Sequence, residues 1–239
     1  MRTRALLPAL PALFLVLLLF SPSSVAAQRS PRASGSFDVL VAHPQGEFAA
    51  YVDAGFGGEA TGRIAIDPAG IVSLRGNLGF LIYGYESKNV CISETVGCRV
   101  QARLRTTNNI FFGGIGPELA IPTPWIRPYV NAFMGFGYFN TTSSLEEQWS
   151  MEDYFTTQNL GDGNFAWGFG GGVEVTLSRG RVPVSLNFGA RYHRNGLMEY
   201  LREGDIVDHP DGSITLRPIV SEANLVAYRI GVSLGIPGS

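Results

Sequence analysis

Strict alternation between apolar and small or polar residues is the feature that most constrains the fold of this chain. In residues 182–192, apolar side chains such as Leu186 and Phe188 occupy even positions, while odd positions hold small or polar ones such as Asn187. The segment 226–236 repeats the pattern, with its apolar residues again at even positions. Period two over this length predicts β-strands with one apolar face.

Eight segments carry this alternation, which predicts an all-β, antiparallel fold of about eight strands. They are residues 36–43, 48–66, 71–86, 99–121, 126–140, 164–178, 182–194 and 224–236. The fourth segment changes phase between Arg105 and Ile115. We expect a β-bulge there, because one extra residue moves the following side chains to the opposite face.

The connections between these segments alternate in length. Tight turns are expected at 67–70, 122–125 and 178–181, and long polar loops at 87–98, 141–163 and 195–223, with one short connection at 44–47 on the loop side. Short turns on one rim and long loops on the other are typical of outer-membrane β-barrels. We therefore expect a closed, up-and-down transmembrane β-barrel, with both termini in the periplasm and the long loops outside the cell.

The beginning of the chain has the features of a cleavable signal peptide. Arg2 and Arg4 precede an apolar run at 6–20, and small residues follow up to Ala27. This order of charged region, apolar region and cleavage site is that of a secretory signal. A membrane anchor is the alternative, but the run is shorter than the roughly 20 residues of a spanning helix. We expect a signal peptide at 1–27 and one barrel domain at 28–239.

Charge lies on the wrong face for a soluble β-protein. A lipocalin-like or sandwich fold shares the alternation, but its buried face is apolar and its outer face is charged. Here charged residues and many of the 30 glycines occupy one face in mid-strand, while the companion face, with Val130, Met134 and Phe136, is almost free of charge. This distribution favours lipid outside and a polar lumen inside.

The expected lumen is a closed one. Eight strands leave an interior just wide enough to be filled by side chains, and buried charges are costly unless they are paired. We expect a lumen charge network of Asp53, Arg63, Arg75, Arg127, Glu174, Arg191 and Arg229, with Asp38 and Glu59 as further acids. Such a network predicts a plugged barrel rather than an open pore.

Composition excludes several other classes. Residues 28–239 hold 16 basic and 20 acidic side chains, scattered singly, so a nucleic-acid partner is not expected. No later apolar run approaches the length of a membrane-spanning helix. Cys91 and Cys98 are the two cysteines of an exported chain, and we expect a disulfide bond between them.

Catalytic, metal and cofactor sites are not expected. His193 lies near Arg191 and Arg194 at the end of a predicted strand, but no serine-centred motif accompanies it. The acidic residues of the last loop lack a full Ca²⁺-loop pattern, and we expect them to be solvated.

Four segments carry a resemblance to a known group of proteins. These are RPYVNAFMGFGYF at 127–139, GARYHRNG at 189–196, DGSITLRP at 211–218 and VAYRIGVSLGI at 226–236. They resemble little-characterised bacterial outer-membrane β-barrel proteins and, more broadly, eight-stranded barrels of the OmpA, OmpX and OmpW type. The resemblance covers nearly all of the mature chain. It implies assembly by the outer-membrane insertion machinery. We expect a monomer, with outer-membrane lipid as its surroundings.

Three functions are compatible with these features. The leading hypothesis is a non-enzymatic surface barrel whose loops have a structural role or contact an external ligand that the sequence does not identify. The alternative is a narrow channel or transporter for small solutes. A lipid-modifying enzyme acting through His193 is the third.

Overall fold

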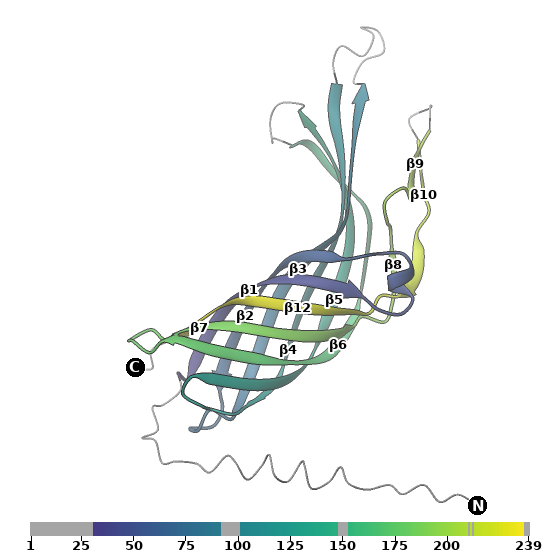
Figure 1. Cartoon of the computed structure of the whole chain (residues 1–239). Coiled ribbons are helices and arrows are strands. Elements are labelled where there is room, and N and C mark those ends of the chain that lie inside the picture. Colours follow the sequence, from purple (N-terminus) through teal and green to yellow (C-terminus); the bar gives the residue numbers. More distant parts are fainter. Residues whose placement is uncertain (1–30, 92–100, 148–152, 210, 212, 237–239) are drawn as a thin grey trace, which may run out of the picture.

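Eight strands close into one antiparallel barrel in the computed structural model of the chain (Figure 1). The structure describes residues 31–91, 101–147, 153–209, 211 and 213–236. The barrel strands are β1 (Ala33–Pro44), β2 (Gly55–Ala65), β3 (Val72–Cys91), β4 (Gln101–Ala120), β5 (Ile126–Glu147), β6 (Asp153–Ser178), β7 (Val184–Arg194) and β12 (Leu225–Ile236). Each strand pairs with its sequence neighbours among these eight, and β1 closes the ring against β12. The predicted all-β fold, a closed antiparallel up-and-down barrel of eight strands, is confirmed.

Shorter elements complete the described part of the chain. A 3-10 helix, η1, spans Phe48–Ala50. Two small hairpin sheets lie in the connection between β7 and β12: β8 (Leu197–Tyr200) pairs with β11 (Ile219–Glu222), and β9 (Ile206–Asp208) pairs with β10 (Ile214–Leu216). No helix in the described ranges is long and apolar enough to cross a membrane. The signal peptide predicted at 1–27 lies outside the described residues.

The first and last described strand residues, Ala33 and Ile236, lie with the tight turns at one rim, which we call the turn end; the opposite rim is the loop end. Ala33 pairs with Ile236 at the turn end. The turn after β2 shows why it is tight: the Asp67 carboxylate accepts hydrogen bonds from the backbone N–H groups of Ala69 and Val72. Gly70 then takes φ 73°, a left-handed conformation that glycine adopts without steric cost.

The strands β3, β5 and β6 are longer than predicted, whereas β4 lies within the predicted 99–121. β3, β4, β5 and β6 contain 20 to 26 residues, against 11 or 12 in the other four barrel strands. Their outer halves project beyond the barrel at the loop end (Figure 1). The expected loops at 87–98 and 141–163 are therefore largely strand where the structure describes them. The alternation fails there because both faces of the projecting sheet are solvated, so neither face needs to be apolar.

The bulge expected in β4 is not there. Even positions of β4, from Asn108 through Ile110 and Phe112 to Glu118, stay on the buried side, and its pairing with β5 keeps one register. The register shift lies opposite, in β3, where Tyr83 is the extra residue between Ile82 and Gly84. The apparent change of phase arises because Ile110 and Phe112 are apolar but face the lumen.

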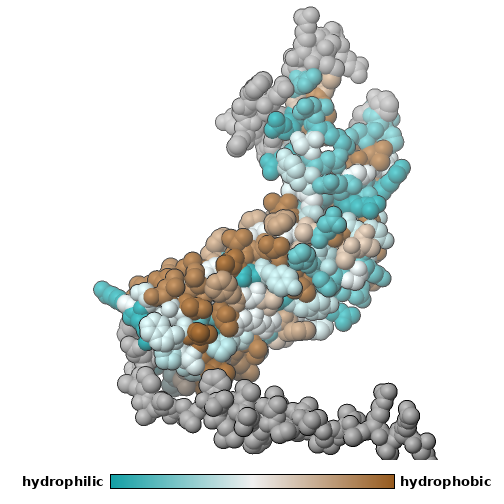
Figure 2. Space-filling model, viewed as in Figure 1, coloured by the Kyte–Doolittle hydropathy of each residue, from teal (hydrophilic) through white to brown (hydrophobic). Residues whose placement is uncertain are grey.

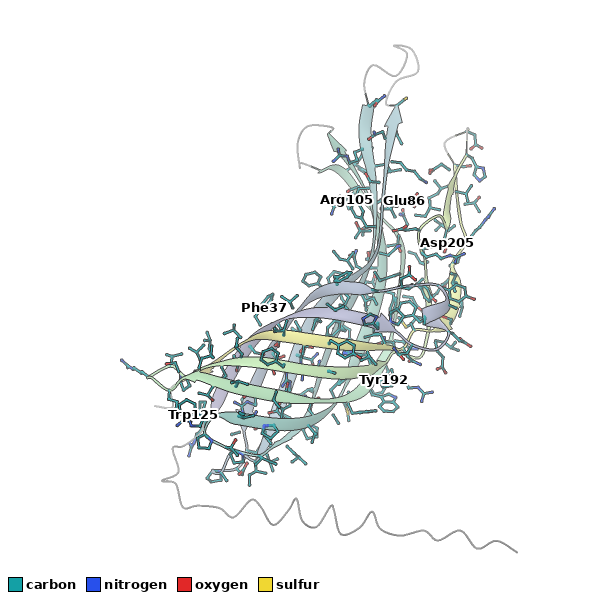
Figure 3. All side chains as sticks on the ribbon, in the orientation of Figure 1. Phe37, Glu86, Arg105, Trp125, Tyr192 and Asp205 are labelled. Carbon is teal, nitrogen blue, oxygen red and sulfur yellow. The ribbon has the colours of Figure 1, made fainter. Side chains whose placement is uncertain are left out.

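Side-chain polarity is reversed relative to a soluble barrel. On β1, Phe37 is 62% exposed while its neighbour Asp38 is fully buried. Figure 2 shows apolar residues gathered on the barrel wall and hydrophilic ones on the projecting strands and loops. Figure 3 shows Phe37 and Tyr192 directed away from the barrel.

Candidate functional site

Three arginines meet one glutamate at the centre of the lumen. Glu59 of β2 faces inward and is 2% exposed. Its Oε2 lies 2.5 Å from Nη1 of Arg191, and its Oε1 lies 3.3 Å from Nη1 of Arg229 and 3.9 Å from Nη2 of Arg75. Thr61 donates a further hydrogen bond to Oε1 at 3.0 Å. Strands β2, β3, β7 and β12 are thereby joined across the interior.

A second acidic centre lies nearer the turn end. The carboxylate of Glu118, fully buried, accepts hydrogen bonds from Nη1 of Arg75 at 2.8 Å and from Nη2 of Arg127 at 2.7 Å. Arg127 also donates to Glu174 at 3.2 Å. Arg63 lies 3.9 Å from Glu174 and donates from Nε to the Ser34 hydroxyl at 2.9 Å. Charges of alternating sign therefore form one chain of contacts along the lumen.

Tyr129 links this chain to Asp38. The Tyr129 hydroxyl accepts a hydrogen bond from Nη2 of Arg229 at 2.9 Å and donates one to Oδ1 of Asn187 at 2.7 Å. The Asn187 amide donates in turn to Asp38 at 2.6 Å. The guanidinium groups of Arg75 and Arg229 also lie over the Tyr129 ring, 5.4 and 5.5 Å from its centroid. These hydrogen bonds join several strands across the buried interior, while the Nε atoms of Arg75, Arg127, Arg191 and Arg229 have no hydrogen-bond partner among the described residues.

The structure brings six of the seven predicted network residues together in the lumen. They are Arg63, Arg75, Arg127, Glu174, Arg191 and Arg229. Asp53 was wrongly included: it is exposed in the segment between η1 and β2, because residues 48–54 are not strand as expected. Glu118 was not among the predicted acids, although it lies on the opposite face of β4 from the exposed Ile115 and Leu119.

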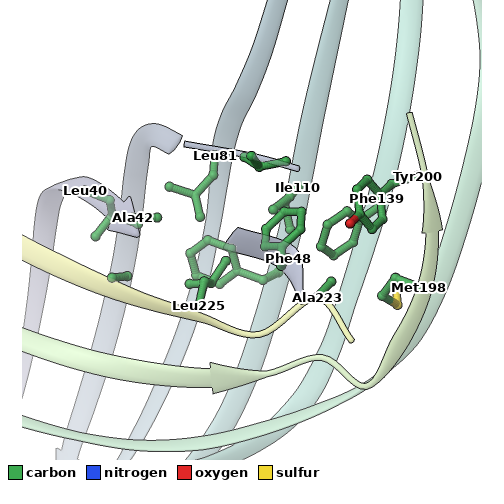
Figure 4. Close-up of a cluster of buried hydrophobic side chains, with 13 residues drawn as sticks. Leu40, Ala42, Phe48, Leu81, Ile110, Phe139, Met198, Tyr200, Ala223 and Leu225 are labelled. Carbon is green, nitrogen blue, oxygen red and sulfur yellow. The ribbon is translucent and has the colours of Figure 1, made fainter. Parts of the chain in front are cut away.

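An apolar cluster closes the lumen at the loop end (Figure 4). Phe48 of η1 turns inward and is 1% exposed. Its ring packs edge-on against Tyr200 of β8, with centroids 5.1 Å apart, and against Phe139 of β5 at 5.8 Å. Leu40, Leu81, Ile110 and Met198 belong to the same cluster. The connecting elements η1 and β8 thus pack into the barrel at its loop end.

His193 lies between the charge network and this cluster. It is 3% exposed, and its ring packs against those of Phe112 and Phe133, with centroids 5.0 and 4.8 Å away. It does not form the solvent-facing rim that a catalytic role would need. No grouping of three or more His, Cys, Asp or Glu side chains in the described part of the chain is arranged to hold a metal.

A small pocket of about 170 Å³ lies at the loop end, between the projecting strands and the β9–β10 hairpin. Leu104, Ile206 and Ile214 supply aliphatic surface, and Glu86, Lys88 and Asp208 supply charge. Figure 3 shows Glu86 on the projecting part of β3, beside the connection that carries Asp205 and leads into β9. The pocket lies outside the lumen.

One ion pair dominates the charged side of this pocket. Nζ of Lys88, the single lysine of the chain, lies 2.8 Å from Oε1 of Glu86 and 3.9 Å from Oδ2 of Asp208. The hydrogen bond from the Lys88 ammonium to the Glu86 carboxylate raises the pKa of Lys88 and lowers the pKa of Glu86. The pair therefore stays charged across the neutral range.

The predicted disulfide is not decided by this structure. Cys91 ends β3, and Cys98 lies outside the described residues. The bond stays a prediction.

The chain matches no known family model, and no curated protein is similar to it in sequence. Similar solved structures include Ail, the attachment invasion locus protein of Yersinia pestis, with 10% identity and a TM-score of 0.45 over 86% of this chain and 98% of Ail. Neisserial surface protein A shows 12% identity and a TM-score of 0.44 over 87% and 99% of the two chains. A major outer membrane protein of Thermus thermophilus shows 12% and 0.41 over 84% and 98%. These similarities assign no ligand or activity to this chain.

Proposed function

We propose that this chain is a non-enzymatic β-barrel of a bacterial outer membrane, with a closed lumen and with strands and loops that contact an external ligand. The observation that carries the proposal is the reversed polarity of the barrel. Its wall is apolar on the outside, and its charges are paired inside. A barrel of this polarity is suited to lipid outside and to a packed, hydrogen-bonded interior.

The exposed wall supports the membrane location. Phe37, Leu78, Val130 and Met134 come from three different strands, β1, β3 and β5, and each is 59% to 64% exposed. Soluble monomers rarely leave apolar patches of more than a few hundred Å² uncovered. Around a barrel in lipid, the same side chains lie in their preferred surroundings, with outer-membrane lipid as the partner.

Packing along the lumen supports a closed barrel over a channel. Inward-facing side chains are buried from the turn end to the loop end: Ser73 is 0% exposed, Glu59 2%, Leu40 2% and Phe48 1%. Two different barriers lie in series, the charge network and the apolar cluster. A steady aqueous path would have to disrupt both.

The surroundings of His193 support a role without catalysis. A general base must come within hydrogen-bond reach of the proton it abstracts. The His193 ring is covered by two phenylalanines and is 3% exposed, so a lipid substrate does not reach it.

Orientation follows from the same proposal. With the turn end in the periplasm, the projecting parts of β3 to β6 and the β8 to β11 region face the outside of the cell. Insertion would then use the outer-membrane assembly machinery, and the chain would function as a monomer. The external ligand would bind on these projecting elements.

The single lysine provides a direct test of location and orientation. Whole cells are treated with a membrane-impermeant amine reagent, and modification of Lys88 is measured by mass spectrometry after outer-membrane fractionation. We expect modification of Lys88, which lies on the projecting part of β3. A Lys88→Arg variant is the control. Recovery in the soluble periplasmic fraction, without a heat-dependent shift in gel mobility, would refute the membrane barrel.

Conductance tests the closed lumen separately. The purified full-length protein is placed in a planar lipid bilayer under a range of voltages. We expect no reproducible single-channel steps. Steady steps of one amplitude would instead support the narrow channel.

A further inference from the structure

We propose that the pocket between the projecting strands and the β9–β10 hairpin binds a protonated aliphatic amine. This inference rests on the proposed function, because the pocket faces external ligands only if the loop end lies outside the cell. It names the chemistry of the ligand that the surface barrel would take.

The size of the pocket limits the ligand to a small group. Sites for drug-sized molecules have volumes of about 300–1,000 Å³. At about 170 Å³, this pocket holds one short chain. Leu104 on β4, Ile206 on β9 and Ile214 on β10 line it. These side chains offer aliphatic contact without an aromatic ring, which suits a flexible methylene chain.

Hydrogen bonds hold the polar lining of the pocket in place; we call this lining, formed by Thr106, Ser143 and Asn159, the floor of the pocket. The Ser143 hydroxyl lies 2.9 Å from that of Thr106 and accepts a hydrogen bond from Nδ2 of Asn159 at 2.7 Å. Three neighbouring strands, β4, β5 and β6, are joined by these contacts. The floor is therefore preformed, and a ligand does not have to order it.

The charge of the pocket favours a cation. Two carboxylates, Glu86 and Asp208, line it together with one ammonium, Lys88, so one negative charge remains. The Glu203 carboxylate lies beside them and accepts a hydrogen bond from the backbone N–H of Tyr85 at 3.1 Å. Asp208 is the less satisfied carboxylate, because its contact with Lys88 is 3.9 Å, longer than a hydrogen bond.

The Lys88 side chain indicates which kind of ligand group fits the pocket. Its side chain is itself a four-carbon chain that ends in an ammonium, and it lies along the pocket with Nζ between Glu86 and Asp208. A ligand amine would pair with Asp208 and extend its chain against Ile206 and Ile214. Lys88 would then compete with the ligand for the same carboxylates.

Two sources could supply this chemistry. One is a small free amine, and the other is the lysine side chain of an extracellular protein. Both present the same ammonium on a short methylene chain. The test therefore includes an arm for each source.

The experiment uses the full-length protein in lipid nanodiscs, with binding followed through the methyl NMR signals of Leu104, Ile206 and Ile214. The probes are n-butylamine, the peptide acetyl-Gly-Lys-Gly-amide and, as the matched anion, butyrate. We expect saturable shifts with the two amines and none with butyrate. Tighter binding of the peptide points to a protein partner, and tighter binding of butylamine points to a free amine.

Two variants test the charge argument in opposite directions. Asp208→Asn should weaken amine binding about three- to fivefold, the range of an exposed ion pair. Lys88→Met should strengthen it by a similar factor, because the competing ammonium is removed. Glu222→Gln, at an exposed ion pair with Arg194 outside the pocket, should leave binding unchanged.

Three results would overturn the inference. They are binding of butyrate as tight as that of butylamine, weaker amine binding in Lys88→Met, and the absence of any shift with the amines. If the same preparations still show the heat-dependent gel shift and no conductance, only the amine site fails and the proposed surface barrel stands.

Discussion

Arg191 of β7 and Glu59 of β2 form a two-point contact across the lumen, although 132 residues separate them in the chain. Nη1 of Arg191 lies 2.5 Å from Oε2 of Glu59, and Nη2 lies 3.2 Å from Oε1. In the ring, β12 and β1 lie between the two strands. The contact therefore ties opposite parts of the wall together, which backbone pairing alone does not do.

Removal of the Glu59 carboxylate should be strongly destabilising. Glu59→Ala leaves Arg191 and Arg229 buried without their shared anion, and breaking a buried pair in this way typically costs about 3–5 kcal/mol. The free energy of unfolding in denaturant, with the barrel in lipid vesicles, measures the loss. Glu222→Gln is the control and should change it by less than about 1 kcal/mol, because its ion pair is exposed. An equal loss in both variants would contradict a special role for the lumen.

Two glycines should differ in how much stability the same substitution costs. A Cβ at Gly172 would lie 2.6 Å from Oη of Tyr129 and 2.2 Å from the Phe188 carbonyl oxygen, whereas a Cβ at Gly62 meets nothing within 4 Å. Gly172→Val should cost roughly 1–3 kcal/mol through overpacking of the lumen. Gly62→Val should stay within about 0.5 kcal/mol. The same unfolding measurement compares them, and equal effects would show that the lumen at Tyr129 is loosely packed.

Opening the apolar cluster should weaken the barrel without making a channel. Phe48→Ala removes a ring that is 1% exposed, and such truncations cost about 3–5 kcal/mol. The charge network around Glu59 still fills the lumen below it. We expect a lower unfolding free energy and no single-channel steps in a planar bilayer. Tyr51→Ala, at an exposed ring just after η1, is the matched control. Steps that appear with Phe48→Ala alone would mean that the network does not block the lumen.

His193 should matter for packing and not for chemistry. His193→Ala removes the ring contacts with Phe112 and Phe133, so we expect a less stable barrel. Lipid composition of the outer membrane should be the same in cells that carry the variant and in cells with the wild-type protein. Arg194→Ala, at the exposed neighbouring position, controls for surface effects. A changed lipid profile specific to His193→Ala would favour a lipid-modifying enzyme.

Alternation of apolar and polar residues was enough to predict the barrel wall, because one face of each strand points outward and the other points into the polar lumen. A residue such as Phe37 faces out and its neighbour Asp38 faces in, so polarity reports orientation directly. The same rule placed Arg75, Arg191 and Arg229 in the lumen. It failed at Ile110 and Phe112, because an apolar cluster inside the barrel reverses the expected polarity.

The loop end could not be predicted in the same way. Projecting strands have solvent on both faces, so their sequence carries no period-two signal around residues such as Thr106 and Ser143. Phe48 was predicted to begin the strand segment 48–66, and only tertiary packing shows that it lies in a 3-10 helix and points into the loop end of the barrel. The pocket depends on the β9–β10 hairpin, and the connection leading into it is joined to β3 by long-range hydrogen bonds, from the Tyr85 N–H to Glu203 and from the Gly204 N–H to Glu86, rather than by local pattern.

The reactivity of Lys88 should report its ion pair through pH. The hydrogen bond to Glu86 raises the pKa of Lys88, so the reactive neutral amine forms at higher pH than in a free lysine side chain. Stabilisation of the ammonium is complete below the ordinary lysine pKa and is lost as pH rises through the raised value.

Acetylation of Lys88 at a series of pH values, followed by mass spectrometry, measures this onset without interference from another lysine. Glu86→Gln removes the anionic partner and should move the onset to lower pH. Asp208→Asn should move it less, because its contact with Nζ is 3.9 Å rather than 2.8 Å. An onset that is unchanged in Glu86→Gln would show that Lys88 is solvated rather than paired, and the charged side of the pocket would then lack the order described here.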